Sequence, residues 1–487
     1  MPELLLGLDV GSTSVRARVV DLEGRLLGSA GRRLRSRHPA PGRTEQDPNE
    51  VWESSRASID GALAEAGRRL SDVGALGLAT QRASVVLWDR ESGEPAAPMV
   101  LWSDLRGIER ARELGDAGFL APPLAAVSKL EAALDAVPDG RARAAAGRLC
   151  WGTIDSYLVH RLTGGALHVT DLSNAWPTCY LDMRDVHRWN AKLIEHQGLE
   201  PRMFPALCDT IGRLGRTAAS ALGTEVPIGA IVADQQSGML AHGLWSPGGW
   251  KATYGTSAAL MVCTGPAPRL IPGLLPLLQL ARGEQLLFAA EGMVNSAGAL
   301  LDWLIGDLGL LSSVEELTDL AARVEDSGGV AIRPALQGLG APHHDPEARA
   351  AVVGLSRASG KGQIARAALE SIAFRVREIA DAVEASPDLE VPTALRVDGG
   401  LTANDLFLQI HADLLGRPIE RHADPEATGL GACLGAALGC GLLGRDDLDR
   451  FAKTDRTFEP RIHPDQARER LARWQRAVSL DEESRAG

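Results

Sequence analysis

The chain has 487 residues and a formal net charge of −12, with 63 acidic and 51 basic side chains. Hydrophobic residues make up 45% and charged residues 23%, a balance that argues against disorder, while the acidic excess argues against a general nucleic-acid surface. No apolar run reaches the roughly 20 residues that a membrane-spanning helix needs, and a length of ~100–200 residues per domain allows two or three domains.

Short apolar runs separated by tight turns open the chain and predict a β-meander. A turn of glycine and hydroxyl residues, Gly11 to Ser14, separates the first two runs. A helix is predicted over residues 48–70, because Pro48 follows Asp47 at a position that suits a first helical turn. The expected strands cover residues 4–8, 15–20, 26–28, 73–79 and 85–89.

Residues 250–262 repeat the plan of the N-terminus, with a short strand, a turn of glycine and hydroxyl residues, and another short strand. Two such units predict two similar lobes whose turns face one ligand. The Ser-Pro-Gly-Gly segment before the second unit is the best boundary signal, so we expect an N-terminal lobe over 1–245 and a C-terminal lobe over 246–487. Apolar residues at every third or fourth position predict a long helix over 363–384.

Further along the second lobe, the sequence predicts a strand over 394–397, a glycine turn over 398–400 and then another helix. The charged segment 463–487 predicts a helix that ends in a solvated tail. The six cysteines are scattered without paired metal spacing, which predicts reduced thiols in a cytoplasmic protein.

A turn of this kind directs backbone N–H groups and hydroxyl donors to one point, which suits a phosphate. The usual phosphate motif is absent, because the segment from Gly354 to Lys361 has five residues between its glycines and Gly362 after the lysine. A nucleotide would therefore be held by another device. Taken alone, the turn from Gly11 to Ser14 is more simply interpreted as a plain structural turn.

Two carboxylates follow buried strands. Asp9 comes after the first strand, where it suits Mg²⁺ bound through waters or the cap of a turn. Asp234 ends the apolar run 226–233, a position that carries catalytic groups in α/β proteins but that also suits a helix N-cap. The residues alone leave both alternatives open for each acid.

Seven segments, in the expected order, resemble the motifs of the FGGY carbohydrate kinases and, among them, most closely the glycerol kinases. The resemblance covers about residues 4 to 445 and implies an α/β fold of two RNase H-like lobes, of the actin, Hsp70 and sugar-kinase type, with ATP in a central cleft. The matching segments are residues 6–20, 80–82 with 100–106, 152–158 with 168–175, 233–236, 254–256, 350–370 and 397–413.

By position, the resemblance implies an ATP- and Mg²⁺-dependent kinase that phosphorylates a hydroxyl of a small polyol or sugar. Asp234 would be the general base that takes the hydroxyl proton as the phosphoryl group arrives, and Asp9 would hold Mg²⁺. The implied phosphate and nucleotide contacts are Ser12, Thr13, Ser14, Arg16, Thr256, Gly298, Gly400 and Asn404. The implied acceptor contacts are Arg82, Trp102, Asp234 and Gln235.

The implied acceptor pocket departs from the glycerol kinase pattern at three positions. Ala83 stands where those kinases have Glu, Leu124 where they have Tyr, and Ala259 where they have an aromatic residue. The loss of a hydrogen bond to a buried hydroxyl costs ~1–3 kcal/mol, so glycerol should bind more weakly. The Gln-Met-His-Gly hallmark of xylulokinases is also missing, since Arg82 follows Gln81. Glycerol, a larger polyol and a ketose such as a pentulose stay open as acceptors.

A catalytically weak sugar sensor or actin-like ATPase is the alternative function, because a fold alone does not determine an activity. Asp234 favours the kinase, since a protein that transfers no phosphoryl group needs no base at an acceptor. Asp104 and Arg106 suit either acceptor ligands or a structural pair. We expect a small-molecule substrate, no nucleic acid and no membrane partner, and a dimer or tetramer of identical chains stays open.

Overall fold

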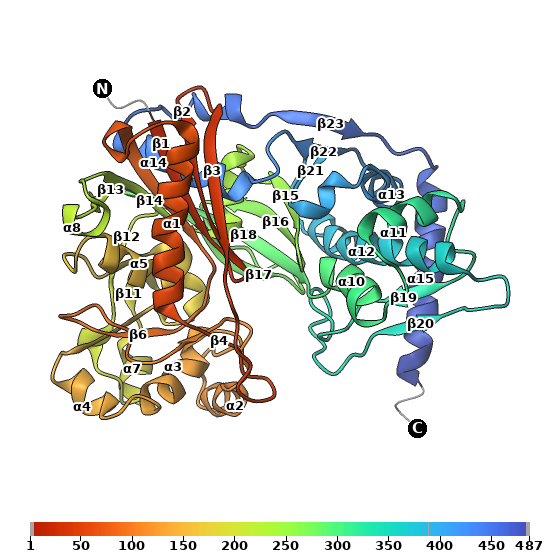
Figure 1. Cartoon of the computed structure of the whole chain (residues 1–487). Coiled ribbons are helices and arrows are strands. Elements are labelled where there is room, and N and C mark those ends of the chain that lie inside the picture. Colours follow the sequence, from red (N-terminus) through yellow and green to blue (C-terminus); the bar gives the residue numbers. More distant parts are fainter. Residues whose placement is uncertain (1–3, 388, 484–487) are drawn as a thin grey trace. The chain divides into compact units, whose positions relative to one another are not determined.

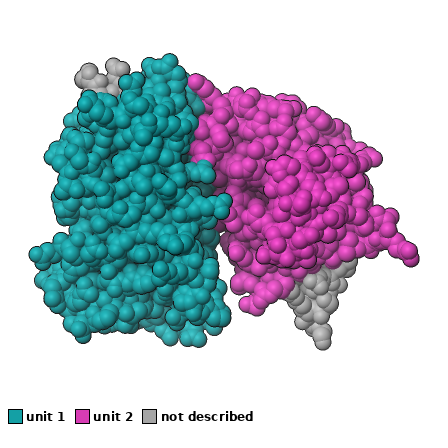
Figure 2. Space-filling model, in the orientation of Figure 1, with its two compact units in different colours: residues 1–243, 277–287, 428–451 teal, residues 244–276, 288–427, 452–487 magenta. Residues whose placement is uncertain are grey.

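The computed structural model describes residues 4–387 and 389–483. They form two compact units, drawn in Figure 1 and coloured separately in Figure 2, and both units are discontinuous in sequence. The first unit takes residues 1–243, 277–287 and 428–451, and the second takes 244–276, 288–427 and 452–487. No feature of the sequence marked the two short segments as parts of the first unit, and the continuous lobes expected over 1–245 and 246–487 stay a prediction.

One six-stranded sheet forms the framework of the first unit. Its order is β13 (Ile211–Arg216), β14 (Pro227–Ala233), β5 (Val73–Thr80), β1 (Leu4–Val10), β2 (Ser14–Asp21) and β3 (Leu26–Arg33). β1, β2 and β3 form the predicted antiparallel meander, whereas β1, β5 and β14 are parallel. The carboxyl ends of these three parallel strands therefore lie at one edge of the sheet, where α/β proteins place their ligands.

The helices of the first unit include the one predicted over 48–70. This helix, α1, ends at Ala66 because Gly67 adopts a left-handed conformation with φ 62° and caps it. The helices are α1 (Pro48–Ala66), α2 (Ile108–Asp116), α3 (Ala126–Asp135), α4 (Gly140–Ala145), α5 (Ile154–Leu162), α6 (Leu172–Ala175), α7 (Ala191–His196), α8 (Ala219–Leu222), α9 (Asp234–Ala241) and, from Thr428 on, α14 (Ala427–Cys440). Two short ribbons pair β4 (Glu45–Gln46) with β7 (Met99–Val100) and β6 (Val86–Asp89) with β8 (Leu149–Gly152).

The two faces of this sheet are built differently, because successive side chains of a strand point to opposite sides. Leu4, Leu6 and Leu8 pack into one core with apolar side chains of α1 and α5. On the opposite face, β1, β5 and β14 each carry a glycine, and a Cβ on any of them would overlap a backbone carbonyl oxygen of α14. These close approaches are Gly7 to Gly429, Gly77 to Ala432 and Gly229 to Ala436.

The second unit repeats this topology. The seven-stranded sheet has the order β17 (Leu275–Arg282), β18 (Gln285–Val294), β16 (Ala258–Gly265), β15 (Trp250–Tyr254), β21 (Leu395–Asp398), β22 (Ile419–His422) and β23 (Thr454–Phe458). Residues 277–287 of β17 and β18 are assigned to the first unit, and the other strands belong to the second. β18, β16 and β15 form an antiparallel meander, and β15, β21 and β22 are parallel. The neighbouring strands β18, β16, β15, β21 and β22 of this sheet correspond in order and direction to β3, β2, β1, β5 and β14 of the first sheet. The prediction of two similar α/β lobes is therefore confirmed.

The predicted long helix of the second unit is α12, which is amphipathic and buries its apolar side against the sheet core. The helices here are α10 (Gly298–Asp302), α11 (Val314–Ala322), α12 (Lys361–Glu384), α13 (Asp405–Leu415) and α15 (Pro464–Glu483). The end of the predicted solvated tail lies outside the described residues. Within the described chain, no helix combines the length and hydropathy needed to cross a membrane.

Candidate active site

The two carboxylates singled out in the sequence lie at the same edge of the first sheet. The register pairs Asp9 with Ala79 and Ala233 with Thr80, so Asp9 and Asp234 flank the carboxyl end of β5. Burial, and after it the negative charge of Asp234, raise the pKa of Asp9 to about 7, against the opposing effect of two arginines on β2. The structure thus brings the predicted metal ligand and the predicted base into electrostatic contact.

Arg82 lies beside Asp234. Its Nε atom is 3.7 Å from Asp234 Oδ1, and the two side chains are 14% and 26% exposed. The backbone N–H of Gln235 donates to the same carboxylate oxygen at 2.7 Å. Three of the four expected acceptor residues therefore gather at the carboxyl end of β5 and β14, half-buried and partly open to a ligand.

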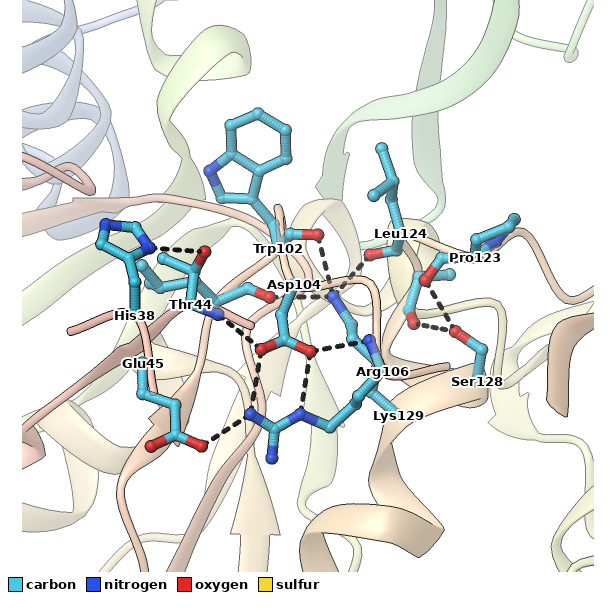
Figure 3. A network of polar contacts seen from close by, with 12 residues as sticks. His38, Thr44, Glu45, Trp102, Asp104, Arg106, Pro123, Leu124, Ser128 and Lys129 are labelled. Atoms are coloured by element: carbon cyan, nitrogen blue, oxygen red, sulfur yellow. Dashed lines mark hydrogen bonds and ion pairs between the residues drawn. The ribbon is translucent and has the colours of Figure 1, made fainter. Parts of the chain in front are cut away.

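The fourth expected residue, Trp102, follows β7 and is held by a buried lysine for which the sequence predicted no role. Lys129 is fully buried, and its Nζ donates to the carbonyl oxygens of Leu101 at 3.0 Å, Trp102 at 2.9 Å and Leu124 at 2.8 Å, as Figure 3 shows. Burial lowers the pKa of Lys129 to about 7. One lysine side chain therefore fixes the spacing between Trp102 and Leu124, two residues of the expected acceptor pocket.

Replacing Lys129 with Met is expected to reduce the free energy of unfolding by roughly 2–4 kcal/mol, because three backbone carbonyls lose their donor. Urea unfolding of both proteins measures the loss. Lys192→Met serves as the control, since Lys192 is exposed and its replacement should change stability by less than ~0.5 kcal/mol. Equal unfolding midpoints for Lys129→Met and the control would show that the three contacts do not stabilise the fold.

Asp104 and Arg106 form a structural pair. Asp104 is fully buried and accepts hydrogen bonds from Arg106 Nε at 2.8 Å and from the backbone N–H of Thr44 at 2.7 Å. Arg106 also donates to Glu45 at 2.6 Å. Burial acts to raise the pKa of Asp104, but the hydrogen bonds from Arg106 and Thr44 lower it overall. Of the two open alternatives, the geometry therefore supports the structural pair.

The turn between β1 and β2 carries the expected phosphate contacts of this unit. Thr13 is exposed, Ser12 and Ser14 are half-buried, and their hydroxyls have no hydrogen-bond partner among the described residues. Arg16 lies on β2 directly opposite Asp9. Arg18 lies two residues after Arg16 on β2, so its side chain points to the same face of the sheet, and it also lowers the pKa of Asp9. The sequence did not identify Arg18, and its only signal there is this two-residue spacing from Arg16.

In the second unit, Thr256 and Gly298 come together. The backbone N–H of Gly298 donates to the carbonyl of Gly255 at 3.0 Å, and that of Ala299 donates to Thr256 at 2.9 Å. A Cβ on Gly298 would lie 2.6 Å from the Gly255 carbonyl oxygen, so only glycine allows the start of α10 to approach the turn this closely. The second expected phosphate turn is therefore packed against the residue expected to contact the nucleotide.

Gly400 and Asn404 follow β21, the strand parallel to β15. Gly399 lies directly against Tyr254, at the end of β15, and Gly400 faces open space. Asn404 caps α13, because its Oδ1 accepts from the backbone N–H of Phe407 at 3.0 Å while its Nδ2 donates to Thr318 at 2.8 Å. The side chain of Asn404 is thus committed to structure, and its nucleotide contact stays a prediction.

The three departures from the glycerol kinase pattern have different surroundings. Ala83 is buried and adopts φ 56°, a left-handed conformation that is strained for a residue with a Cβ. Leu124 is 42% exposed beside Trp102. Ala259 is buried in β16 of the second unit. None of the three side chains offers a hydrogen-bonding group.

A buried polar network supports the strand ends that carry Arg82 and Asp234. Asp171 caps α6 by accepting from the backbone N–H groups of Ser173 at 2.8 Å and Asn174 at 3.1 Å. Ser173 Oγ then accepts from the N–H of Ala233 at 2.9 Å, and Asn174 Oδ1 accepts from the Thr80 hydroxyl at 3.2 Å. Asp171 therefore orients the last residue of β14 and of β5 through two neighbouring side chains.

Known proteins share this architecture over nearly the whole chain. Residues 4–241 match the N-terminal domain of the FGGY family of carbohydrate kinases, and residues 250–440 match its C-terminal domain. The glycerol kinase of Alkalilimnicola ehrlichii is 40% identical over 489 residues, which cover 98% of each chain. Among solved structures, the glycerol kinase of Plasmodium falciparum with ADP has a TM-score of 0.88 at 25% identity over 98% of each chain. A xylulose kinase from Rhodospirillum rubrum has a TM-score of 0.81 at 25% identity, again over 98% of each chain.

Two matched domains and 40% identity along the full length establish the family. The enzyme class follows from it, with ATP as the phosphoryl donor and an alcohol group as the acceptor. The chain therefore belongs to the FGGY family of carbohydrate kinases and catalyses the ATP-dependent phosphorylation of a polyol or sugar.

Proposed function

We propose that this kinase phosphorylates a small polyol, with glycerol as the first candidate, and that Asp234 is its general base. The observation that carries the proposal is the placement of Arg82 Nε 3.7 Å from Asp234 Oδ1, at the strand ends that also carry Gln235 and Asp9. The full-length relatives named glycerol kinase support glycerol as the acceptor.

In this mechanism, Asp234 accepts the proton of the acceptor hydroxyl as the terminal phosphoryl group of ATP reaches the oxygen. Arg82 donates hydrogen bonds to acceptor hydroxyls together with Gln235, and the Trp102 indole covers a carbon face of the acceptor. Most of the rate enhancement comes from positioning and from neutralisation of phosphate charge. The proposed phosphate and nucleotide contacts are Ser12, Thr13, Ser14, Arg16, Thr256, Gly298, Gly400 and Asn404.

The residues present fit Mg²⁺ bound together with ATP. Burial and Asp234 raise the pKa of Asp9 to about 7, so a cation beside Asp9 would offset the proximity of two carboxylates. No group of three or more His, Cys, Asp or Glu side chains in the described part of the chain could hold a metal by itself. Mg²⁺ usually takes one or two carboxylates together with substrate phosphates, whose charge it neutralises. We therefore propose Asp9 as the protein's contribution to this site.

A ketose is the second candidate acceptor. The observation that favours it is the absence of a polar side chain at Ala83 and Leu124, where the pattern of glycerol kinases has hydroxyl partners. An ADP-release screen over glycerol, tetritols, pentitols, pentuloses and hexuloses tests both candidates. Glycerol is expected among the accepted compounds. ADP release that no compound accelerates would overturn the proposed acceptor class, and turnover with ketoses alone would replace glycerol by the second candidate.

The double variant Ala83→Glu, Leu124→Tyr is expected to lower the KM for glycerol roughly tenfold or more, because each new side chain restores a hydrogen-bonding partner. The KM for any larger acceptor found in the screen should rise, and the KM for ATP should stay unchanged. Leu120→Tyr is the matched control, since Leu120 is also an exposed leucine, at 64%. An unchanged KM for glycerol in the double variant would show that these two positions do not set the acceptor.

We also propose the cytoplasm as the compartment of this enzyme, because all six cysteines are free thiols, as expected for reducing surroundings. The expected dimer or tetramer stays a prediction. Light scattering of the purified protein measures its mass and so tests that prediction directly.

A further inference from the structure

The turn between β1 and β2 has every carbonyl oxygen occupied. The N–H of Gly11 donates to the carbonyl of Ser14 at 3.0 Å within the turn. The backbone N–H of Leu34, directly after β3, donates to the carbonyl of Thr13 at 2.9 Å. The remaining two carbonyls are held by glutamine side chains, Ser12 by Gln46 Nε2 at 2.6 Å and Gly11 by Gln81 Nε2 at 3.4 Å. In contrast, the backbone N–H groups of Ser12 and Thr13 have no acceptor among the described residues.

This arrangement selects for an anion. Carbonyl oxygens repel phosphate, whereas free N–H groups and hydroxyls of a turn attract it. With its carbonyls engaged, the turn presents the N–H groups of Ser12 and Thr13 and three hydroxyls that can rotate to donate. We propose that Gln46, assisted by Gln81, is a positioning residue that fixes this polarity for the phosphates of ATP. The inference rests on the proposed function, which makes this turn a phosphate contact.

The side-chain amides of Gln46 and Gln81 are oriented so that their N–H₂ groups donate to the turn while their oxygens accept no hydrogen bond within the described structure. Gln46 donates both to Ser12 and to the Ser36 hydroxyl, the latter at 3.2 Å. The Oε1 atoms of Gln46 and Gln81 are buried and have no hydrogen-bond partner within the described structure. A buried acceptor without a partner destabilises the fold, and rotating either amide would place its oxygen against a carbonyl oxygen. Their N–H₂ groups are therefore the part that serves the turn.

Gln46 sits on a rigid support. It lies in β4, which pairs with β7, and the two residues before it are fixed to the buried Asp104–Arg106 pair shown in Figure 3. The N–H of Thr44 donates to Asp104, and Glu45 accepts from Arg106 at 2.6 Å. Asp104 and Arg106, for which the sequence left open a ligand or a structural role, thus anchor the strand from which Gln46 reaches the turn.

Gln46→Met, which keeps the size of the side chain and removes the donor, tests the inference. The Kd of a non-hydrolysable ATP analogue, measured calorimetrically on the full chain, is expected to rise roughly 5–10-fold. The Kd of adenosine and the KM of the acceptor should stay unchanged, because neither contacts this turn. Gln46→Glu should weaken the analogue by roughly tenfold more, since it adds negative charge beside the phosphates. Gln81→Met repeats the test at Gly11.

Gln197→Met is the matched control, because Gln197 is a buried glutamine of the same unit whose Nε2 donates to the carbonyl of Val127 at 2.9 Å. It should lower stability without changing the affinity for the analogue. If Gln46→Met lowers the affinity for the analogue and the affinity for adenosine by the same factor, Gln46 has a purely structural role and the inference is overturned. Thr13→Val tests the phosphate turn itself. If it weakens the analogue while Gln46→Met does not, the inference alone fails; if neither does, the assignment of the turn fails.

Discussion

Asp234→Asn is expected to lower kcat by roughly 10²–10⁴-fold while nucleotide affinity stays nearly unchanged. Asparagine keeps the size of the side chain and its contact with the N–H of Gln235, but it cannot accept the proton of the acceptor hydroxyl. Steady-state kinetics with the acceptor found in the screen, together with calorimetric titration of ADP, measure the two quantities separately.

The same change at Asp182, whose carboxylate accepts from the backbone N–H of Arg184 and from no other group among the described residues, controls for the loss of a charge elsewhere in the unit and should leave kcat unchanged. Near-normal turnover of Asp234→Asn would exclude Asp234 as the base. A large loss of ADP affinity would instead place Asp234 in nucleotide binding.

Asp171→Ala should reduce the free energy of unfolding by roughly 3–5 kcal/mol, because it leaves several buried donors without an acceptor. These donors are the N–H groups of Ser173 and Asn174, the Asn174 amide at 2.8 Å and the Thr210 hydroxyl at 2.8 Å. Activity should fall as well, since Ser173 and Asn174 hold the strand ends before Asp234 and Arg82. Urea unfolding and steady-state kinetics measure both effects.

Asp171→Asn should recover much of the stability, because its Oδ1 can still cap α6. Asp182→Ala is the control. Because Asp182 is half-buried in a turn, this change should lower the free energy of unfolding by less than ~1 kcal/mol. If Asp171→Ala unfolds at the same urea concentration as this control, the network does not support the strand ends, and the motif around residue 171 needs another explanation.

The fold could be predicted where its signals are local. Alternating apolar runs and glycine turns in residues 4–28 and 250–262 identify the two meanders, because strand period and turn chemistry depend on neighbouring residues. The membership of 277–287 and 428–451 in the first unit could not be predicted in this way. It depends on contacts between residues far apart in the chain, for which these segments carry no pattern of their own.

The site shows the same division. The residues alone place Asp9 and Asp234 at the ends of two buried strands, and only the family resemblance assigns them to one site. The register shows why they meet, because their strands are parallel to β5 and end at one edge of the sheet. Lys129 and Gln46 could not be identified, because their partners are backbone carbonyls, which every residue has. Asn404 shows a limit of the family resemblance for a single side chain. The resemblance implies a nucleotide contact for Asn404, but its side chain already caps α13.

The contact of α14 with Gly7, Gly77 and Gly229 affects how the protein is made. The three strands leave the ribosome early, but the helix that covers their glycine face is encoded in residues 427–440 and follows nearly the whole second unit. Until that stretch is translated, the nascent N-terminal half exposes an uncovered sheet face. It cannot complete its fold during synthesis as an early domain normally does. A premature stop before this helix would therefore yield a chain that contains Asp9, Arg82 and Asp234 but lacks the element that completes their sheet.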